Sequence, residues 1–241
     1  LYLFQTKSFK MNETFVIPFI SEEWISYNTI TLIFVLFFLF IPCFFDHKTK
    51  YRFANLLSIL ILFEIVFIQS YYVYNGIWTI EESMPFHMCR LMWIGSFFLL
   101  LTKSQIAFEF LLFIGMMGGV HSLLTPQLTH GSDTLLLIDY FFVHGGLIVA
   151  PLFCLFSLGM RPRKNAWYKT FFYLQIFIFC VALIDFFSGG NYMYLSIKPI
   201  VDNPFLIGDW PYYIIGLELA TLLHALLVYI PFYLKNYFLS E

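Results

Sequence analysis

The chain has 241 residues, of which 60% are hydrophobic and 12% are charged, whereas a soluble domain carries about 25% charged residues. This composition excludes an ordinary soluble globular protein and predicts an integral membrane protein. The net charge of -2 at pH 7 argues against a broad surface for nucleic acid, so no nucleic-acid partner is expected.

The amino-terminal 24 residues are expected to form a leader and an outer tail. Residues 1–5, LYLFQ, resemble the end of a protease-cleavable expression tag, and Met11 resembles a natural start, so residues 1–10 support no inference about the fold. The first strongly apolar run begins near Ile25. It is too long for a signal-peptide core and lacks a small-residue cleavage site, so it is expected to remain as a helix.

Seven apolar stretches approach the roughly 20 helical residues that cross a hydrocarbon core of about 30 Å. The predicted transmembrane helices cover residues 25–45, 53–75, 85–102, 106–125, 135–159, 166–188 and 211–234. Turn-forming and charged segments separate them. The sequence therefore predicts an all-α polytopic bundle, with residues 25–234 as a single transmembrane domain and residues 235–241 as a cytoplasmic tail.

Basic residues in the short loops predict the orientation, because cytoplasmic loops are enriched in Lys and Arg. The second and fourth loops carry none, and the sixth carries only Lys198. The first, third and fifth loops carry Lys48, Lys50, Arg52, Lys103, Arg161, Arg163 and Lys164. We therefore expect the amino terminus outside a cell membrane and the carboxyl terminus, with Lys235, inside. Lys7 and Lys10 oppose this orientation.

Under this topology, ionisable side chains of five helices are expected at one level in the outer leaflet. They are Cys89, His121, Asp139 with Tyr140, His144, Asp185 and Glu218. Glu64, Glu109 and His224 are expected to lie elsewhere. Ionisable groups at membrane depth are costly and mark functional sites, although hydrogen bonding between helices is the structural alternative.

Cys89 stands in the segment ESMPFHMCRLMW, directly before an apolar run. A lone cysteine packs like a small hydrophobic residue, but a cation, a helix amino terminus or a histidine base makes it a nucleophile. Arg90 is its neighbour and Pro85 precedes it. The expected base is His144, because it is the histidine best placed by depth, with Tyr140 one turn away. Gly145 and Gly146 after it leave room for another backbone or an acyl chain. His87 points to another face of the helix and is expected to position other groups.

Other features allow two interpretations each. A zinc site could draw on His87, His121, His144, Asp139 and Asp185, but no H-E-x-x-H or H-x-x-x-H pair is present, and no metal or other cofactor is expected. Small-residue spacing at Gly115, Gly118 and Gly119 is typical of a helix interface, and a ligand groove is the alternative. The aromatic sixth loop, residues 189–210, could be either a lid over the outer mouth or an interfacial aromatic belt.

The segments PFHMCR, GGVHSLLTP, YFFVHG, NYMYLSIKP and WPYY, in this order, resemble bacterial YwaF-like integral membrane proteins and, through them, the eukaryotic transmembrane protein 164 acyltransferases. The resemblance runs from about Pro85 to Tyr213. It implies an enzyme that moves a fatty acyl chain between lipids, with Cys89 and His144 as the catalytic pair and membrane phospholipid and lysolipid as partners. His121 stands where bacterial relatives commonly have glutamine.

These observations together predict a thioester mechanism. His144 takes the proton of Cys89, the thiolate attacks a phospholipid ester in the extracytoplasmic leaflet, and the acyl group passes to a second lipid or to water. Arg90 is expected to hold a phosphate or to stabilise the thiolate, and His87, Asn191 or Lys198 to donate to the oxyanion or the headgroup. The alternatives are a metal-dependent membrane lipid hydrolase, and a non-enzymatic seven-helix transporter or receptor.

Overall fold

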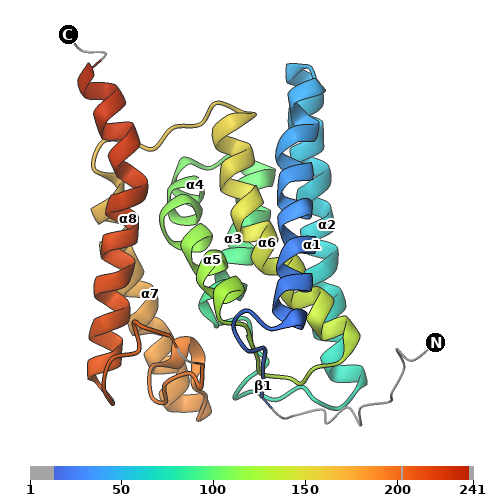
Figure 1. Cartoon of the computed structure of the whole chain (residues 1–241), viewed down its shortest axis with the longest axis vertical. Coiled ribbons are helices and arrows are strands. Elements are labelled where there is room, and N and C mark those ends of the chain that lie inside the picture. Colours follow the sequence, from blue (N-terminus) through green and yellow to red (C-terminus); the bar gives the residue numbers. More distant parts are fainter. Residues whose placement is uncertain (1–13, 202, 239–241) are drawn as a thin grey trace.

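The computed structural model describes residues 14–201 and 203–238, and it describes side chains as far as residue 234. Residues 1–10 and the side chain of Lys235 lie outside this description. The helices are α1 (Glu22–Phe40) with the 3-10 turn η1 (Ile41–Phe44), α2 (His47–Tyr74), α3 (Met88–Thr102), α4 (Gln105–Phe110), the π-helical η2 (Leu111–Gly115), α5 (Met116–Leu124), α6 (Thr134–Phe156), α7 (Ala166–Ser188), the 3-10 turn η3 (Tyr192–Tyr194) and α8 (Tyr212–Phe238) (Figure 1). Strands β1 (Phe15–Val16) and β2 (Gln127–Leu128) pair in antiparallel fashion.

The predicted all-α membrane bundle is confirmed, with α4, η2 and α5 forming one interrupted helix. Within the described residues, six helices are long and apolar enough to cross a membrane. The seventh, α3, has 15 residues and rises about 22 Å, less than a hydrocarbon core of about 30 Å. It begins at Met88 rather than at Pro85, because residues 80–87 form turns and bends. Cys89 therefore lies in the first helical turn.

The other helix boundaries differ most at α2, which begins at His47 instead of residue 53. The Asp46 side chain accepts a hydrogen bond from the backbone N–H of Thr49 at 2.7 Å and caps the helix. Charged residues before the apolar run thus belong to the first turns of the helix, because a cap and not hydropathy sets its start.

Helix α6 is the centre of the bundle, since it packs against α1, α3 and α5 and more than half of the residues in its most apolar stretch are buried. Helices α7 and α8 pack against each other, and both also contact η2, while α7 contacts α4 (Figure 1). The cavity described below lies between this pair and the remaining helices, beside the loops that precede α3 and α6.

Glycines let these helices approach closely. A Cβ atom added at Gly119 of α5 would lie 2.8 Å from the carbonyl oxygen of His144, as the predicted helix interface requires. On α6, a Cβ added at Gly145 would lie 2.8 Å from Thr31 of α1, and one at Gly146 would overlap the Trp93 ring of α3. Protein side chains, and not an acyl chain, therefore fill the space beside Gly145 and Gly146.

The Gly146→Ala variant is expected to be less stable than the wild type by about 1–3 kcal/mol, because overpacking would displace the buried Trp93 ring. Thermal unfolding in detergent measures the change. The matched control is Gly95→Ala on α3, where nothing lies within 4 Å of the added Cβ and the melting temperature should stay level or rise. Equal melting temperatures for Gly146→Ala and the wild type would contradict the tight packing of α3 on α6.

Candidate active site

A cavity of about 380 Å³ lies beside the start of α3, within the range of about 300–1,000 Å³ typical of small-molecule sites. Its walls come from α2, α3, α5, α6, α7, α8 and three loops. Eight of the residues expected from the sequence line it: His87, Cys89, Arg90, His121, Asp139, Tyr140, His144 and Glu218. Asp185, Asn191 and Lys198 are not among its lining residues.

Cys89 is the second residue of α3, where the partial positive charge of a helix amino terminus favours an anion. Its sulfur lies 3.5 Å from the hydroxyl oxygen of Ser122 on α5. His87 is the N-cap residue of α3, and its side chain makes no capping hydrogen bond. Within the described residues, no acceptor takes the backbone N–H groups of Met88 and Cys89. The start of α3 thus offers unpaired donors next to the thiol.

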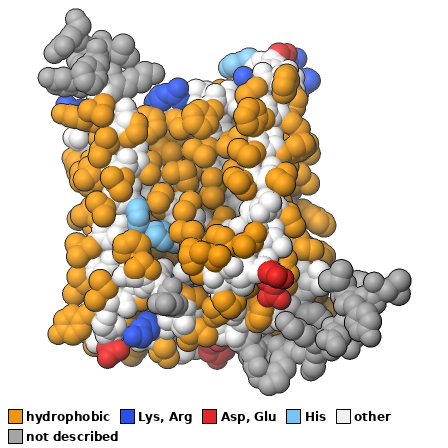
Figure 2. Space-filling model, viewed as in Figure 1, with side chains coloured by type: hydrophobic (Ala, Val, Ile, Leu, Met, Phe, Trp, Pro, Cys, Tyr) orange, Lys and Arg blue, Asp and Glu red, His pale blue; other side chains and the backbone are white. Residues whose placement is uncertain are grey.

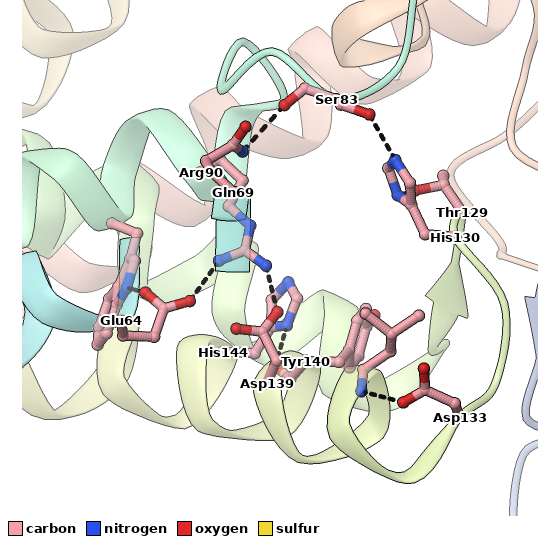
Figure 3. Close-up of polar contacts among 12 residues, drawn as sticks. Glu64, Gln69, Ser83, Arg90, Thr129, His130, Asp133, Asp139, Tyr140 and His144 are labelled. Atoms are coloured by element: carbon pink, nitrogen blue, oxygen red, sulfur yellow. Dashed lines mark hydrogen bonds and ion pairs between the residues drawn. The ribbon is translucent and has the colours of Figure 1, made fainter. Parts of the chain in front are cut away.

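His144 is held with a defined tautomer. Its Nδ1 lies 2.6 Å from the carbonyl oxygen of Tyr140, which can only accept a hydrogen bond, so Nδ1 carries the proton. The Nε2 atom therefore presents a lone pair, and Figure 3 shows it on the side of the ring away from that carbonyl. A histidine in this state can act as a general base.

Cys89 and His144 border the same cavity, but among the described contacts no hydrogen bond joins the sulfur to either ring nitrogen. Tyr140 connects their surroundings instead. Its ring centroid lies 4.1 Å from that of His144, and its hydroxyl donates to the carbonyl oxygen of Ser122 at 2.9 Å. Catalytic hydrogen bonds are often long in a ligand-free enzyme and shorten when substrate binds.

Arg90 joins three helices in an ion network (Figure 3). Its Nη1 donates to Glu64 of α2 at 2.8 Å and its Nη2 pairs with Asp139 of α6. The indole N–H of Trp93 donates to the second oxygen of Glu64. The expectation that Glu64 lies apart was wrong, because the long Arg90 side chain spans the difference in depth between the two backbones. Arg90 is occupied by two carboxylates, so a lipid phosphate would have to compete with them.

The expectation that His224 lies apart was also wrong. Its ring centroid is 4.7 Å from that of His121, and the Phe205 ring lies 5.3 Å from His121 and 5.6 Å from His224. Nearby, Glu218 of α8 accepts a hydrogen bond from Gln175 of α7 at 2.8 Å. By contrast, Glu109 does lie apart, near the end of α4, where it pairs with Arg163 at 2.7 Å.

The sixth loop lies against the cavity and contributes Met193, Tyr194 and Leu195 to its wall, as the lid interpretation predicts. The three polar residues expected at the site instead shape this loop. Asp185 accepts from the Tyr192 backbone N–H at 2.9 Å. Asn191 accepts from the backbone N–H groups of residues 196 and 197, and Lys198 pairs with Asp209 at 3.3 Å.

Sequence reasoning missed a second polar group on the cavity wall. The hydroxyl oxygen of Ser83 lies 3.0 Å from Nε2 of His130, and that of Thr129 lies 2.9 Å from Nδ1 (Figure 3). The His130 ring stacks on Tyr72 at 4.3 Å. Burial, and then Arg90, lower the pKa of His130 to about 4, so it is neutral at pH 7. The sequence signal for Ser83, Thr129 and His130 is weak because these residues lie in loops, where position along a helix does not indicate depth.

In the described part of the chain, no three or more His, Cys, Asp or Glu side chains are grouped so that they could hold a metal ion. Asp139 pairs with Arg90, and Nδ1 of His144 bonds to the Tyr140 carbonyl oxygen. Asp185 is not among the residues that line the cavity. The zinc alternative therefore lacks a ligand cluster on which a site could be built.

Comparison with known proteins identifies a family. The family model described as the TMEM164 family matches residues 19–234, which include every helix named above up to residue 234 of α8. No curated protein and no solved structure matches the chain.

Proposed function

Because the chain belongs to the TMEM164 family of membrane proteins, we propose that it is an acyltransferase which moves a fatty acyl chain from a phospholipid to a lipid acceptor through a thioester on Cys89. One observation carries the proposal. Cys89 stands at the amino terminus of α3 on the wall of the cavity into which His144, protonated on Nδ1, can present a basic Nε2.

The reaction would proceed in two halves. In the first, Nε2 of His144 takes the proton of Cys89, and the sulfur bonds to the ester carbonyl carbon. The bond from that carbon to the glycerol oxygen then breaks, and the leaving oxygen takes the proton from His144. In the second, the hydroxyl of the acceptor gives its proton to His144 and attacks the thioester, and the proton returns to the sulfur.

Lipid substrates fit the surroundings of the cavity. Leu174 and Ile178 of α7 and Leu217 of α8 line it, and both helices are long and apolar enough to cross a membrane. A phospholipid donor and a lysolipid acceptor could therefore reach Cys89 from the bilayer. Tyr140 and Ser122 would keep the thiol and the base in register during both halves.

We further propose that the site acts in the extracytoplasmic leaflet of a cell membrane, with the amino terminus outside. The support is the distribution of Lys and Arg residues between the two ends of the bundle. The cavity lies beside the start of α3, whereas Lys48, Lys103 and Arg163 belong to loops or helix ends at the opposite end of the bundle. Figure 2 shows most of the visible Lys and Arg side chains gathered along one rim of the mainly hydrophobic surface. Because cytoplasmic loops of membrane proteins carry an excess of Lys and Arg, this rim is expected to face the cytoplasm and the cavity the opposite side.

A covalent acyl-enzyme tests the proposal. Purified protein in phosphatidylcholine vesicles, stopped with acid, should carry one fatty acyl group on the peptide that contains Cys89, and neutral hydroxylamine should remove it. The exposed Cys43 and Cys180 are internal controls, because an acyl group on them would indicate nonspecific transfer. Fatty-acid release that a chelator stops, with no adduct on Cys89, would favour the metal-dependent hydrolase. Lipid that binds unchanged would favour a transporter or receptor.

A further inference from the structure

Tyr194 lies in a strained part of the cavity wall. Met193 and Tyr194 both have a φ of 56°, in the left-handed region that residues other than glycine seldom adopt. The Tyr213 hydroxyl donates to the carbonyl oxygen of Tyr194 at 2.7 Å, and the N–H of Tyr194 donates to that of Asn191 at 3.2 Å. Such conformations persist only where surrounding contacts hold them, and they are frequent at functional sites.

The Tyr194 hydroxyl is connected to the surroundings of Cys89. The Gln127 side-chain amide donates to it at 3.2 Å, and the Gln127 backbone N–H donates to the Tyr140 hydroxyl at 3.3 Å. Tyr140 in turn donates to Ser122, whose own hydroxyl lies 3.5 Å from the Cys89 sulfur. Tyr194 and Cys89 both line the cavity beside these residues.

This hydroxyl is available as a donor. It accepts the hydrogen bond from Gln127, and its own proton has no acceptor among the residues that the structure describes. Burial, and then the neighbouring Cys89 and Glu82, raise the pKa of Tyr194 to about 12, so the proton is retained at neutral pH. His87, the N-cap residue of α3, also lines the cavity, and its ring centroid lies 5.7 Å from that of Tyr194.

We infer that Tyr194 is a further catalytic residue, whose hydroxyl donates a hydrogen bond to the acyl carbonyl oxygen while Cys89 attacks. The inference rests on the proposed function. As the sulfur electron pair forms the bond to carbon, the C=O π pair moves onto oxygen, and the resulting oxyanion needs donors already in place. The unpaired N–H groups of Met88 and Cys89 would supply further donors. Asn191 and Lys198, expected from the sequence to fill this role, are engaged in their own loop.

Two reactions of the same thiol separate this role from a structural one. Transfer of an acyl group from a p-nitrophenyl fatty ester to Cys89 passes through an oxyanion, whereas alkylation by iodoacetamide does not. Both rates are measured on the Cys89 peptide by mass spectrometry. In Tyr194→Phe, acylation should slow by about 10²–10³-fold, the usual effect of removing one oxyanion donor. Alkylation should keep the wild-type rate.

The matched control is Tyr192→Phe. It removes another tyrosine hydroxyl of the same loop, which donates to the carbonyl oxygen of Ile80 at 2.7 Å and accepts from the N–H of Met84 at 3.0 Å. Loss of these two hydrogen bonds should destabilise the loop. Because Tyr192 is not among the cavity-lining residues, acylation of the folded protein should stay unchanged.

Equal acylation rates in Tyr194→Phe and the wild type would overturn the inference. A parallel slowing of acylation and alkylation would overturn it as well, because the variant would then have displaced Cys89 rather than removed a donor. If wild-type Cys89 is alkylated but never acylated, the proposed function itself fails and the inference fails with it. The two failures are therefore distinguishable.

Discussion

Replacing Cys89 by alanine is expected to abolish acyl transfer, with a loss of about 10⁴-fold or more, the size seen when the nucleophile of a catalytic unit is removed. The fold should survive, because the side chain is small and, among the described residues, Ser122 is the only hydrogen-bond partner of its sulfur. Lipid analysis of vesicles or of expressing cells by mass spectrometry measures the loss. The matched control, Cys180→Ala, removes an exposed cysteine of α7 and should keep full activity.

His144→Ala should lose activity to a similar extent, and the Cys89→Ala/His144→Ala double variant should be no worse than either single variant, because residues that act as a unit are not additive. A Cys89→Ser variant that kept full lipid-remodelling activity would contradict the thioester. Activity that survived in His144→Ala but fell only in the double variant would show that another group serves as the base.

Replacing Arg90 by methionine is expected to cost about 3–5 kcal/mol of stability, because it leaves the buried carboxylates of Glu64 and Asp139 without their cation. The side chains of Glu64 and Asp139 are only 13% and 8% exposed, so water screens the charges poorly. Thermal unfolding, or recovery of monodisperse protein in detergent, measures the loss. Adding Glu64→Gln and Asp139→Asn should restore most of it, since no buried charge then remains unpaired.

The control for Arg90 is Arg163→Met at the other end of the bundle. Arg163 is 61% exposed, and its partner Glu109 would keep hydrogen bonds from the Arg163 backbone N–H and from Gln105. The loss should therefore be smaller than for Arg90→Met. A wild-type melting temperature for Arg90→Met would show that the network does not stabilise the contact of α2, α3 and α6.

The sequence predicts the fold well because hydropathy over about 20 residues reports directly on a bilayer. It predicts helix starts less well, since these depend on single caps and turns. Asp46 starts α2 early by capping it, and the turns at residues 80–87 delay α3. Hydropathy does not register either effect.

The candidate site shows a similar division. Motif order and helix depth indicated Cys89 and His144, and the structure places both on one cavity. Depth along a helix does not indicate rotation about the helix axis or the reach of a side chain. The contact of Arg90 with Glu64 and that of His121 with His224 therefore could not be predicted from depth. The position of Tyr194 depends on a left-handed backbone segment, which no periodicity predicts.

The π-helical segment η2 determines which side of α5 is turned toward Cys89. Here the N–H of Met116 donates to the carbonyl oxygen of Leu111, five residues back instead of four, so the segment holds one residue more than an α-helix of equal advance. One residue corresponds to about 100° of rotation. Deleting a single residue from Leu111–Gly115 would keep the span almost unchanged in length while turning Ser122 away from the Cys89 sulfur. A one-residue gap in this segment of a homologous chain would therefore mark a different cavity on the same fold.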